Sequence, residues 1–245
     1  FVVIGKTTNT NKLSLKFNNK VVGEIPIEAL ASKAPIYSRK WIKKKPCKNT
    51  IELKNLKKIK IEDALIKILS SPNHSNKTWV TNQYDQMVMC DTVQRSGSDA
   101  AIIRIHNKDK AIAVSVDSSA NYCKSYPLTG GKQIVCENWR NLITVGAKPL
   151  AITNCLNFGN PENQEVMGEF AECLEGIKEA CEFLNYPVVS GNVSFYNGTN
   201  KKNIYPTPVI GGVGLIKKLS KPLNHSFQEA NSSLLLIGKT FGHLE

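Results

Sequence analysis

A long amphipathic helix constrains the fold of this chain more than any other feature of the sequence. From Asn163 to Leu184, apolar residues recur at spacings of three and four, and glutamates occupy the opposite side. Such an apolar stripe becomes stable by packing against another layer. The short β-branched runs 149–153 and 187–190 flank the helix and are typical of buried strands. The segment therefore predicts a helix that packs on a sheet.

Neighbouring residues extend this pattern into an α+β domain. The runs 100–105 and 111–116 predict a β-hairpin, and a second amphipathic helix follows Gly130 and ends at Gly146. A further strand is expected at 209–216. The resulting order ββαβαββ mixes hairpins with crossovers, which is typical of a ferredoxin-like α+β fold.

The segments on either side of this domain are less regular. Alternation at Leu13–Phe17 predicts a strand, the run Phe1–Gly5 is also strand-like, and helical spacing appears at 27–31 and 61–69 between prolines. The run 232–238 indicates the beginning of another strand. Because the first residue is Phe rather than Met and the last run is followed by few residues, we expect a piece of a longer polypeptide.

The net charge of +12 is concentrated in one part of the chain. The first 80 residues hold 17 of the 32 Lys and Arg but five of the 20 Asp and Glu. The lysines at 43–45 and 54–60 are interleaved with Asn and Ile and lack the aromatic platforms of single-strand binders. This pattern favours a solvated connecting segment over a polyanion site, and a basic nucleic-acid-binding module is the alternative from another class.

Cysteine usage and hydropathy indicate the compartment. The seven cysteines form no Cys-x-x-Cys pair, which is typical of a reducing environment and does not predict a structural zinc site. The apolar runs are shorter than the roughly 20 residues of a membrane helix, and the beginning of the chain lacks a signal-peptide pattern. We therefore expect a cytoplasmic protein that binds neither membrane nor nucleic acid.

Polar and glycine-rich residues follow the predicted strands in four loops, at 96–101, 154–161, 190–196 and 205–214. Loops at strand ends are the usual positions of ligand sites. Each loop taken alone is weak evidence, and a simple turn explains each equally well.

The third loop carries the most specific chemistry. Gly191 lets the backbone approach a phosphate closely, Asn192 offers an oxygen of the kind that Mg²⁺ prefers, and Ser194 would point to the same side as Asn192 in an extended chain. The alternative is an Asn-Gly type of turn that joins two strands and binds no ligand. Likewise, Thr129–Lys132 could hold an anion at a helix start or act as a plain N-terminal cap.

Taken in order, four motifs resemble one enzyme family. They are Gly97–Ala101, Leu156–Glu162, Ser190–Ser194 and Pro206–Gly211. The sequence resembles the second half of the small, free-standing synthetase subunit of formylglycinamide ribonucleotide amidotransferase, also called phosphoribosylformylglycinamidine synthase. Residues 24–30 and 34–37 resemble the link between the two halves of that subunit, and 83–88 resemble the entry to its second half.

The resemblance implies a fold similar to that of aminoimidazole ribonucleotide synthetase (PurM-like), in which ferredoxin-like domains build a shared β-barrel and α/β domains flank it. It also implies four segments in this chain. They are the end of the first flanking domain (1–23), a lysine-rich linker between halves (24–80), the ATP-binding, barrel-forming domain (81–220) and the beginning of the last domain (221–245).

The resemblance further implies an ATP-dependent ligase of purine biosynthesis. Formylglycinamide ribonucleotide would be activated by ATP and converted by ammonia to the amidine, with a glutaminase subunit and a small bridging subunit as partners. Carried over by position, Asn154 and Gly191 would contact ATP, Asn192 would bind Mg²⁺ and Ser194 would bind the ribonucleotide. Asn154 stands where the family usually has Asp, and Gly198 where relatives tend to be acidic.

The catalytic His of the family lies in its first half, so no catalytic residue is expected in this chain. We therefore expect the chain alone to be inactive and to need its own first half as a partner. Sister ATP-using synthetases of the aminoimidazole ribonucleotide or selenophosphate type are the alternative enzymes, and the motif Leu156–Glu162 argues against them. A nucleotide-binding scaffold without chemistry is a further alternative.

Overall fold

The computed structural model describes residues 1–45, 60–219, 223–227 and 229–238. The chain divides into two compact units, Phe1–Arg39 and Lys40–Glu245. Most of the second lysine cluster, at 54–60, lies outside the described residues. The expected segment boundaries near residues 24, 81 and 221 stay predictions.

The first unit is a small antiparallel hairpin followed by one helical turn. Strand β1 (Lys12–Phe17) pairs with β2 (Lys20–Pro26), and α1 (Ile27–Leu30) follows. Asn18 and Asn19 form the two-residue loop with φ of 48° and 60°, as a tight hairpin turn requires. The predicted strand at 13–17 and the predicted short helix are confirmed, whereas the run Phe1–Gly5 is not a strand.

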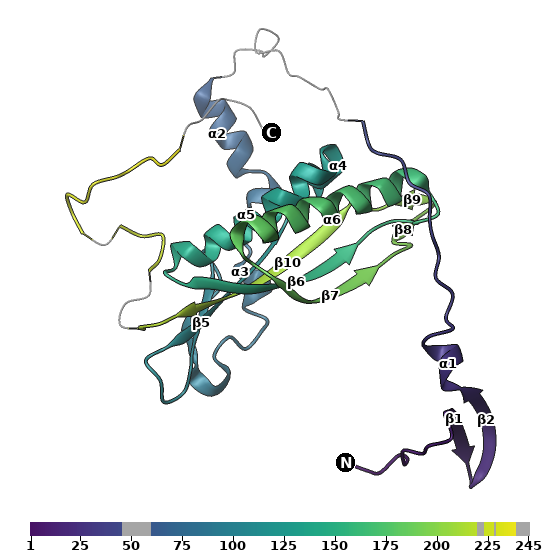
Figure 1. The fold of residues 1–245 in the computed structure, drawn as a ribbon. Coiled ribbons are helices and arrows are strands. Elements are labelled where there is room, and N and C mark those ends of the chain that lie inside the picture. The colour runs from purple at the N-terminus through teal and green to yellow at the C-terminus, as the bar shows by residue number, and fades with distance from the viewer. Residues whose placement is uncertain (46–59, 220–222, 228, 239–245) are drawn as a thin grey trace. The chain divides into compact units, whose positions relative to one another are not determined.

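A six-stranded sheet forms the centre of the second unit (Figure 1). Its spatial order is β3 (Thr92–Gln94), β4 (Ala101–Arg104), β5 (Ala111–Ser118), β10 (Thr207–Ile216), β6 (Lys148–Asn157) and β7 (Val188–Ser194). The β6–β7 pair is parallel and the other pairs are antiparallel, because a helix crosses over between β6 and β7. The predicted α+β class and the predicted hairpin of 100–116 are confirmed.

Helices cover one face of this sheet (Figure 1). They are α4 (Ala120–Ser125), α5 (Pro127–Thr144) and α6 (Gln164–Leu184). The two long helices approach each other closely through glycine: a Cβ at Gly131 would overlap the Cys173 carbonyl oxygen, and one at Gly176 would overlap that of Leu128. Residues 129–132, which the sequence placed at a helix start, lie inside α5, because that helix begins at Pro127. Gly131 serves the packing of the two helices.

The predicted long helix is confirmed together with its ends. The Asn163 side chain accepts hydrogen bonds from the backbone N–H groups of Glu165 (2.8 Å) and Val166 (3.3 Å), and Asn185 ends the helix with a φ of 49°. Two of the glutamates opposite the apolar stripe, Glu169 and Glu172, are buried.

Alternate residues of β5 and β10 point to opposite faces of the sheet. Ala111, Ala113, Ile210 and Ile216 are buried on the helix-covered face, while Val116 on the other face is 68% exposed. The sheet thus has one face in the core and one open face.

Short elements make up the rest of the described chain. They are α2 (Ile61–Leu69), α3 (Thr78–Thr81), the 3-10 turns Pro72–His74 and Val88–Cys90, and the hairpin of β8 (Gly198–Thr199) and β9 (Lys202–Asn203). The predicted helix at 61–69 is confirmed. The predicted strand at 232–238 is wrong, because these residues have no strand partner. Within the described part of the chain, no helix has the length and apolarity needed to span a membrane.

Candidate nucleotide site at the ends of β6 and β7

The four predicted site residues lie on two adjacent strands. In the parallel β6–β7 pair, Asn154 is opposite Gly191, and Asn157 is opposite Ser194. The sequence placed residues 154–157 and 190–194 in loops, whereas the structure continues both strands through them. The polar character of 190–194 has a physical reason, because β7 is an edge strand and its side chains are largely exposed.

Gly191 and Asn154 fit each other closely. A Cβ on Gly191 would overlap Oδ1 of Asn154 and come within 3.1 Å of its Cγ. The side chain of Asn154 therefore occupies the space that the missing side chain of Gly191 leaves. Position 191 requires glycine because of this neighbour, whatever ligand the site binds.

Asn192 presents its amide on the open face. It is exposed and is paired in register with Cys155, two positions along from the Thr153–Ser190 pair on the same face. The intervening Asn154–Gly191 pair alternates to the opposite face. Among the hydrogen bonds between described residues, none uses the Asn192 side chain. Its carbonyl oxygen is thus available to a ligand, as a metal-binding role would require.

Ser194 is held by an asparagine that sequence reasoning missed. Nδ2 of Asn197 donates to Oγ of Ser194 (3.0 Å), to the Ser194 carbonyl (3.0 Å) and to the Phe158 carbonyl (3.0 Å). The Ser194 hydroxyl in turn lies 3.2 Å from Oδ1 of Asn197. Asn197 thereby joins the end of β7 to the loop after β6. The signal in the sequence was an amide three residues after a strand-end serine.

The β8–β9 hairpin closes the same end of the sheet. The backbone N–H of Asn160 donates to Oδ1 of Asn203 at 3.0 Å, and a Cβ on Gly159 would meet that side chain at 2.5 Å. A Cβ on Gly198 would lie 2.6 Å from the Lys202 carbonyl oxygen. This narrow turn leaves no room for a Cβ at position 198, which explains glycine there where relatives tend to be acidic.

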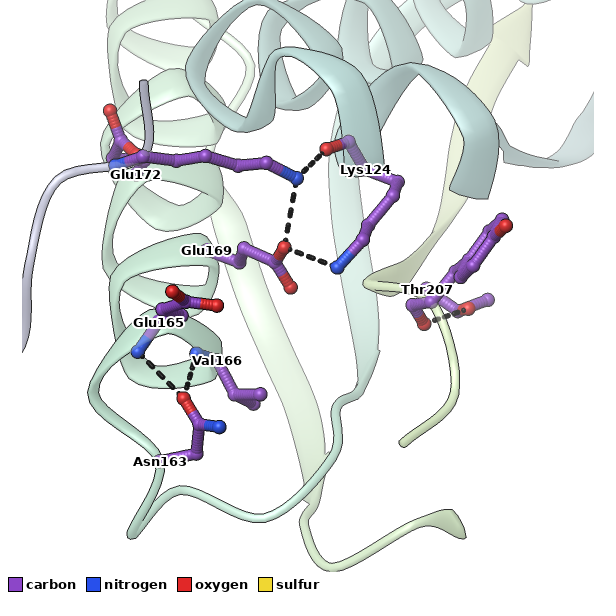
Figure 2. Close-up of polar contacts among 9 residues, drawn as sticks. Lys124, Asn163, Glu165, Val166, Glu169, Glu172 and Thr207 are labelled. Atoms are coloured by element: carbon purple, nitrogen blue, oxygen red, sulfur yellow. Dashed lines mark hydrogen bonds and ion pairs between the residues drawn. The ribbon is translucent and has the colours of Figure 1, made fainter. Parts of the chain in front are cut away.

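A row of small polar side chains continues along the open face. The hydroxyls of Thr153 and Ser190 are 2.8 Å apart, and Nδ2 of Asn157 donates to the Thr207 carbonyl at 3.3 Å. Beside the site, the Thr207 hydroxyl donates to the Tyr205 carbonyl at 2.8 Å (Figure 2). The row offers neutral donors and acceptors rather than fixed charge.

Groups of three or more His, Cys, Asp or Glu side chains suited to a metal ion do not occur among the described residues. A divalent cation at Asn192 would therefore need oxygens from its ligand, in the way that Mg²⁺ is usually bound together with substrate phosphates. The free amide of Asn192 is compatible with that arrangement.

Comparisons with known proteins indicate what the chain is similar to. Residues 97–216 match the family model "AIR synthase related protein, N-terminal domain". The phosphoribosylformylglycinamidine synthase subunit PurL of Pelagibacter ubique is 55% identical over 246 aligned residues, which cover 100% of this chain and 34% of that protein. Over its whole length, the chain is similar to phosphoribosylformylglycinamidine synthase subunits.

Solved structures of the family agree in fold. The structure of PurLQS from Thermotoga maritima has a TM-score of 0.66 and 31% identity, over 85% of this chain and 32% of that one. T. maritima PurL complexed with ATP has a TM-score of 0.62 and 30% identity, over 84% of this chain and 31% of that one. The chain spans about a third of the length of the curated relatives it matches. The expected aminoimidazole ribonucleotide synthetase-like fold is confirmed.

Proposed function

We propose that this chain is the second-half nucleotide-binding part of a phosphoribosylformylglycinamidine synthase. The observation that carries the proposal is the parallel β6–β7 pair, which brings Asn154, Gly191, Asn192 and Ser194 to neighbouring positions within the residues that match the family model. Relatives named for this synthase support the reaction, and a relative solved with ATP supports the cofactor.

In this proposal, Gly191 and Asn154 contact ATP, and Asn192 supplies an oxygen to Mg²⁺. Bound Mg²⁺ would neutralise phosphate charge during phosphoryl transfer. Asn154 carries no charge, so its amide would recognise the nucleotide through hydrogen bonds alone. Each of these two residues limits the position of the other, whether or not a nucleotide is bound.

Ser194 would bind formylglycinamide ribonucleotide. Its hydroxyl is oriented by Asn197, which keeps the rotamer fixed before a ligand arrives. The overall reaction uses ATP and ammonia from glutamine to convert the formyl amide to an amidine in cytoplasmic purine biosynthesis. The catalytic His is expected outside this chain, as are the glutaminase and small bridging subunits.

The open face of the sheet would contact the first half of the same enzyme. Val116 and Val213 are 68% and 40% exposed on this face, and Ile103 of β4 is 40% exposed. A sheet with apolar side chains on an uncovered face is expected to close against a second sheet, as in a shared barrel.

Calorimetric titration tests the proposal. ATP with Mg²⁺ is titrated into the wild-type chain and into Asn192→Ala, with Asn82→Ala as the control at an exposed asparagine outside the sheet. We expect ATP binding that strengthens with Mg²⁺ in the wild type and in the control. In Asn192→Ala, the strengthening by Mg²⁺ should be lost. Binding by Asn192→Ala with an unchanged Mg²⁺ dependence would contradict the assignment.

A further inference from the structure

The segment of residues 42–44 is docked along helix α6. The backbone N–H of Ile42 donates to the Gln164 carbonyl at 3.2 Å, and that of Lys44 donates to Oε2 of Glu172 at 3.0 Å. Between these two points, a Cβ on Gly168 would overlap the Ile42 carbonyl oxygen. The surface of α6 is therefore shaped to receive this backbone.

The same contact explains two buried carboxylates. The side chain of Glu169 is 4% exposed, and its Oε1 lies 2.9 Å from Nζ of Lys44 and 2.6 Å from Nζ of Lys124. Figure 2 shows the Glu169 carboxylate directed at the Lys124 ammonium. A buried carboxylate without a partner is strongly unfavourable, so Glu169 depends on cations supplied by separate segments.

Lys44 also links the docked segment to helix α4. Its ammonium donates to the backbone carbonyl of Lys124 as well as to Glu169. Nζ of Lys124 lies 6.0 Å from the centre of the Tyr205 ring, in the segment that leads into β10. A single side chain thus connects the linker, α6 and the last turn of α4.

We propose that residues 42–44 form a latch, a linker segment whose docking on α6 orders the end of α4 and the Tyr205 segment. Three features indicate that the surface of α6 is specifically shaped to bind residues 42–44. These are the glycine that admits the backbone, the carboxylate that accepts a backbone N–H, and the carboxylate shared by two lysines. The proposal concerns the linker and is independent of the nucleotide site.

Site-resolved hydrogen exchange on the full chain tests the latch. The amides of Ile42 and Lys44 are followed in the wild type, in Lys44→Gln and in Gly168→Ala, with Lys43→Gln as the control at the neighbouring exposed lysine. We expect Lys44→Gln and Gly168→Ala to exchange about tenfold faster at both amides, since a charge-assisted hydrogen bond is lost or displaced. The control should exchange like the wild type.

Two results would overturn the latch. One is exchange of the Ile42 and Lys44 amides in the wild type at the rate of an unstructured peptide. The other is equal acceleration by Lys43→Gln and Lys44→Gln. Circular dichroism melting accompanies each variant, and if Gly168→Ala fails to fold, the comparison of the two lysine variants decides.

Discussion

Single residues at the candidate site are fixed by steric fit as much as by chemistry. Gly191 leaves the space that the side chain of Asn154 fills, and Asn197 holds Ser194 through its amide. Beneath the sheet, the hydroxyl of Tyr186 donates to Oδ1 of the fully buried Asn138 at 2.8 Å. The first and the last of these contacts each make a separate prediction.

Substitution of Gly191 by Ala should lower the stability of the chain. The new methyl group overlaps Asn154, so we expect a loss of about 1–3 kcal/mol in the free energy of unfolding, as for other overpacked sites. The double variant Gly191→Ala/Asn154→Ala should recover most of the lost free energy of unfolding, because the overlap is removed. Gly5→Ala is the control, since its Cβ would meet nothing within 4 Å. Urea denaturation measures all four proteins, and equal losses in the single and double variants would contradict the steric explanation.

Tyr186→Phe should destabilise the chain by about 1–2 kcal/mol, because Asn138 loses its hydrogen-bond donor in a buried position. Burial raises the pKa of Tyr186 above its usual value of about 10. A raised folded-state pKa stabilises the fold below the unfolded-state pKa, and this contribution is lost as the pH rises above about 10. Denaturation from pH 8 to 11 should therefore show a smaller alkaline loss in Tyr186→Phe than in the wild type. An identical alkaline loss would argue against a buried, neutral tyrosine.

Helices α5 and α6 pack at a distance that only glycine permits. A Cβ on Gly176 would overlap the Leu128 carbonyl oxygen, although alanine is the better helix former by about 1 kcal/mol. We therefore expect Gly176→Ala to lower the free energy of unfolding by about 2 kcal/mol, since packing outweighs propensity. The control Glu175→Ala, at an exposed side chain one residue earlier, should change it by less than about 0.5 kcal/mol. Thermal melting that ranks Gly176→Ala as the more stable variant would refute this packing.

Periodicity in the sequence predicted the elements that have a strong amphipathic pattern. Helix α6, helix α5 and the β4–β5 hairpin were predicted because local spacing determines them. The strand character of 190–194 was missed because polar residues are tolerated on an edge strand, where exposure removes the apolar signal. That of 154–157 was missed because Cys155 and Asn157 of β6 point to the open face and carry no apolar signal. Asn197 and the contacts of Lys44 with α6 depend on tertiary contacts, which local patterns do not encode.

At the scale of the whole molecule, the open face of the sheet leaves apolar side chains of the second unit exposed. The exposed valines at 116 and 213 belong to neighbouring strands, and apolar surface of this kind favours association. We expect the chain alone to self-associate as its concentration rises. The variant Val116→Lys/Val213→Lys should remain monomeric in size-exclusion chromatography with light scattering. A wild-type chain that stays monomeric at every concentration would contradict association through the open face.

The central proposal is that one nucleotide and magnesium site forms on the β6–β7 pair, with Asn192 and Ser194 on the open face and the adjacent Asn154–Gly191 pair alternating to the other face. The most direct measurement is paramagnetic broadening of the backbone amide signals by Mn²⁺, used in place of Mg²⁺, with a non-hydrolysable ATP analogue. The account predicts broadening centred on residues 191–194 and 154 that requires the nucleotide and disappears in Asn192→Ala. Broadening centred elsewhere on the sheet, or no effect at β7, would contradict it.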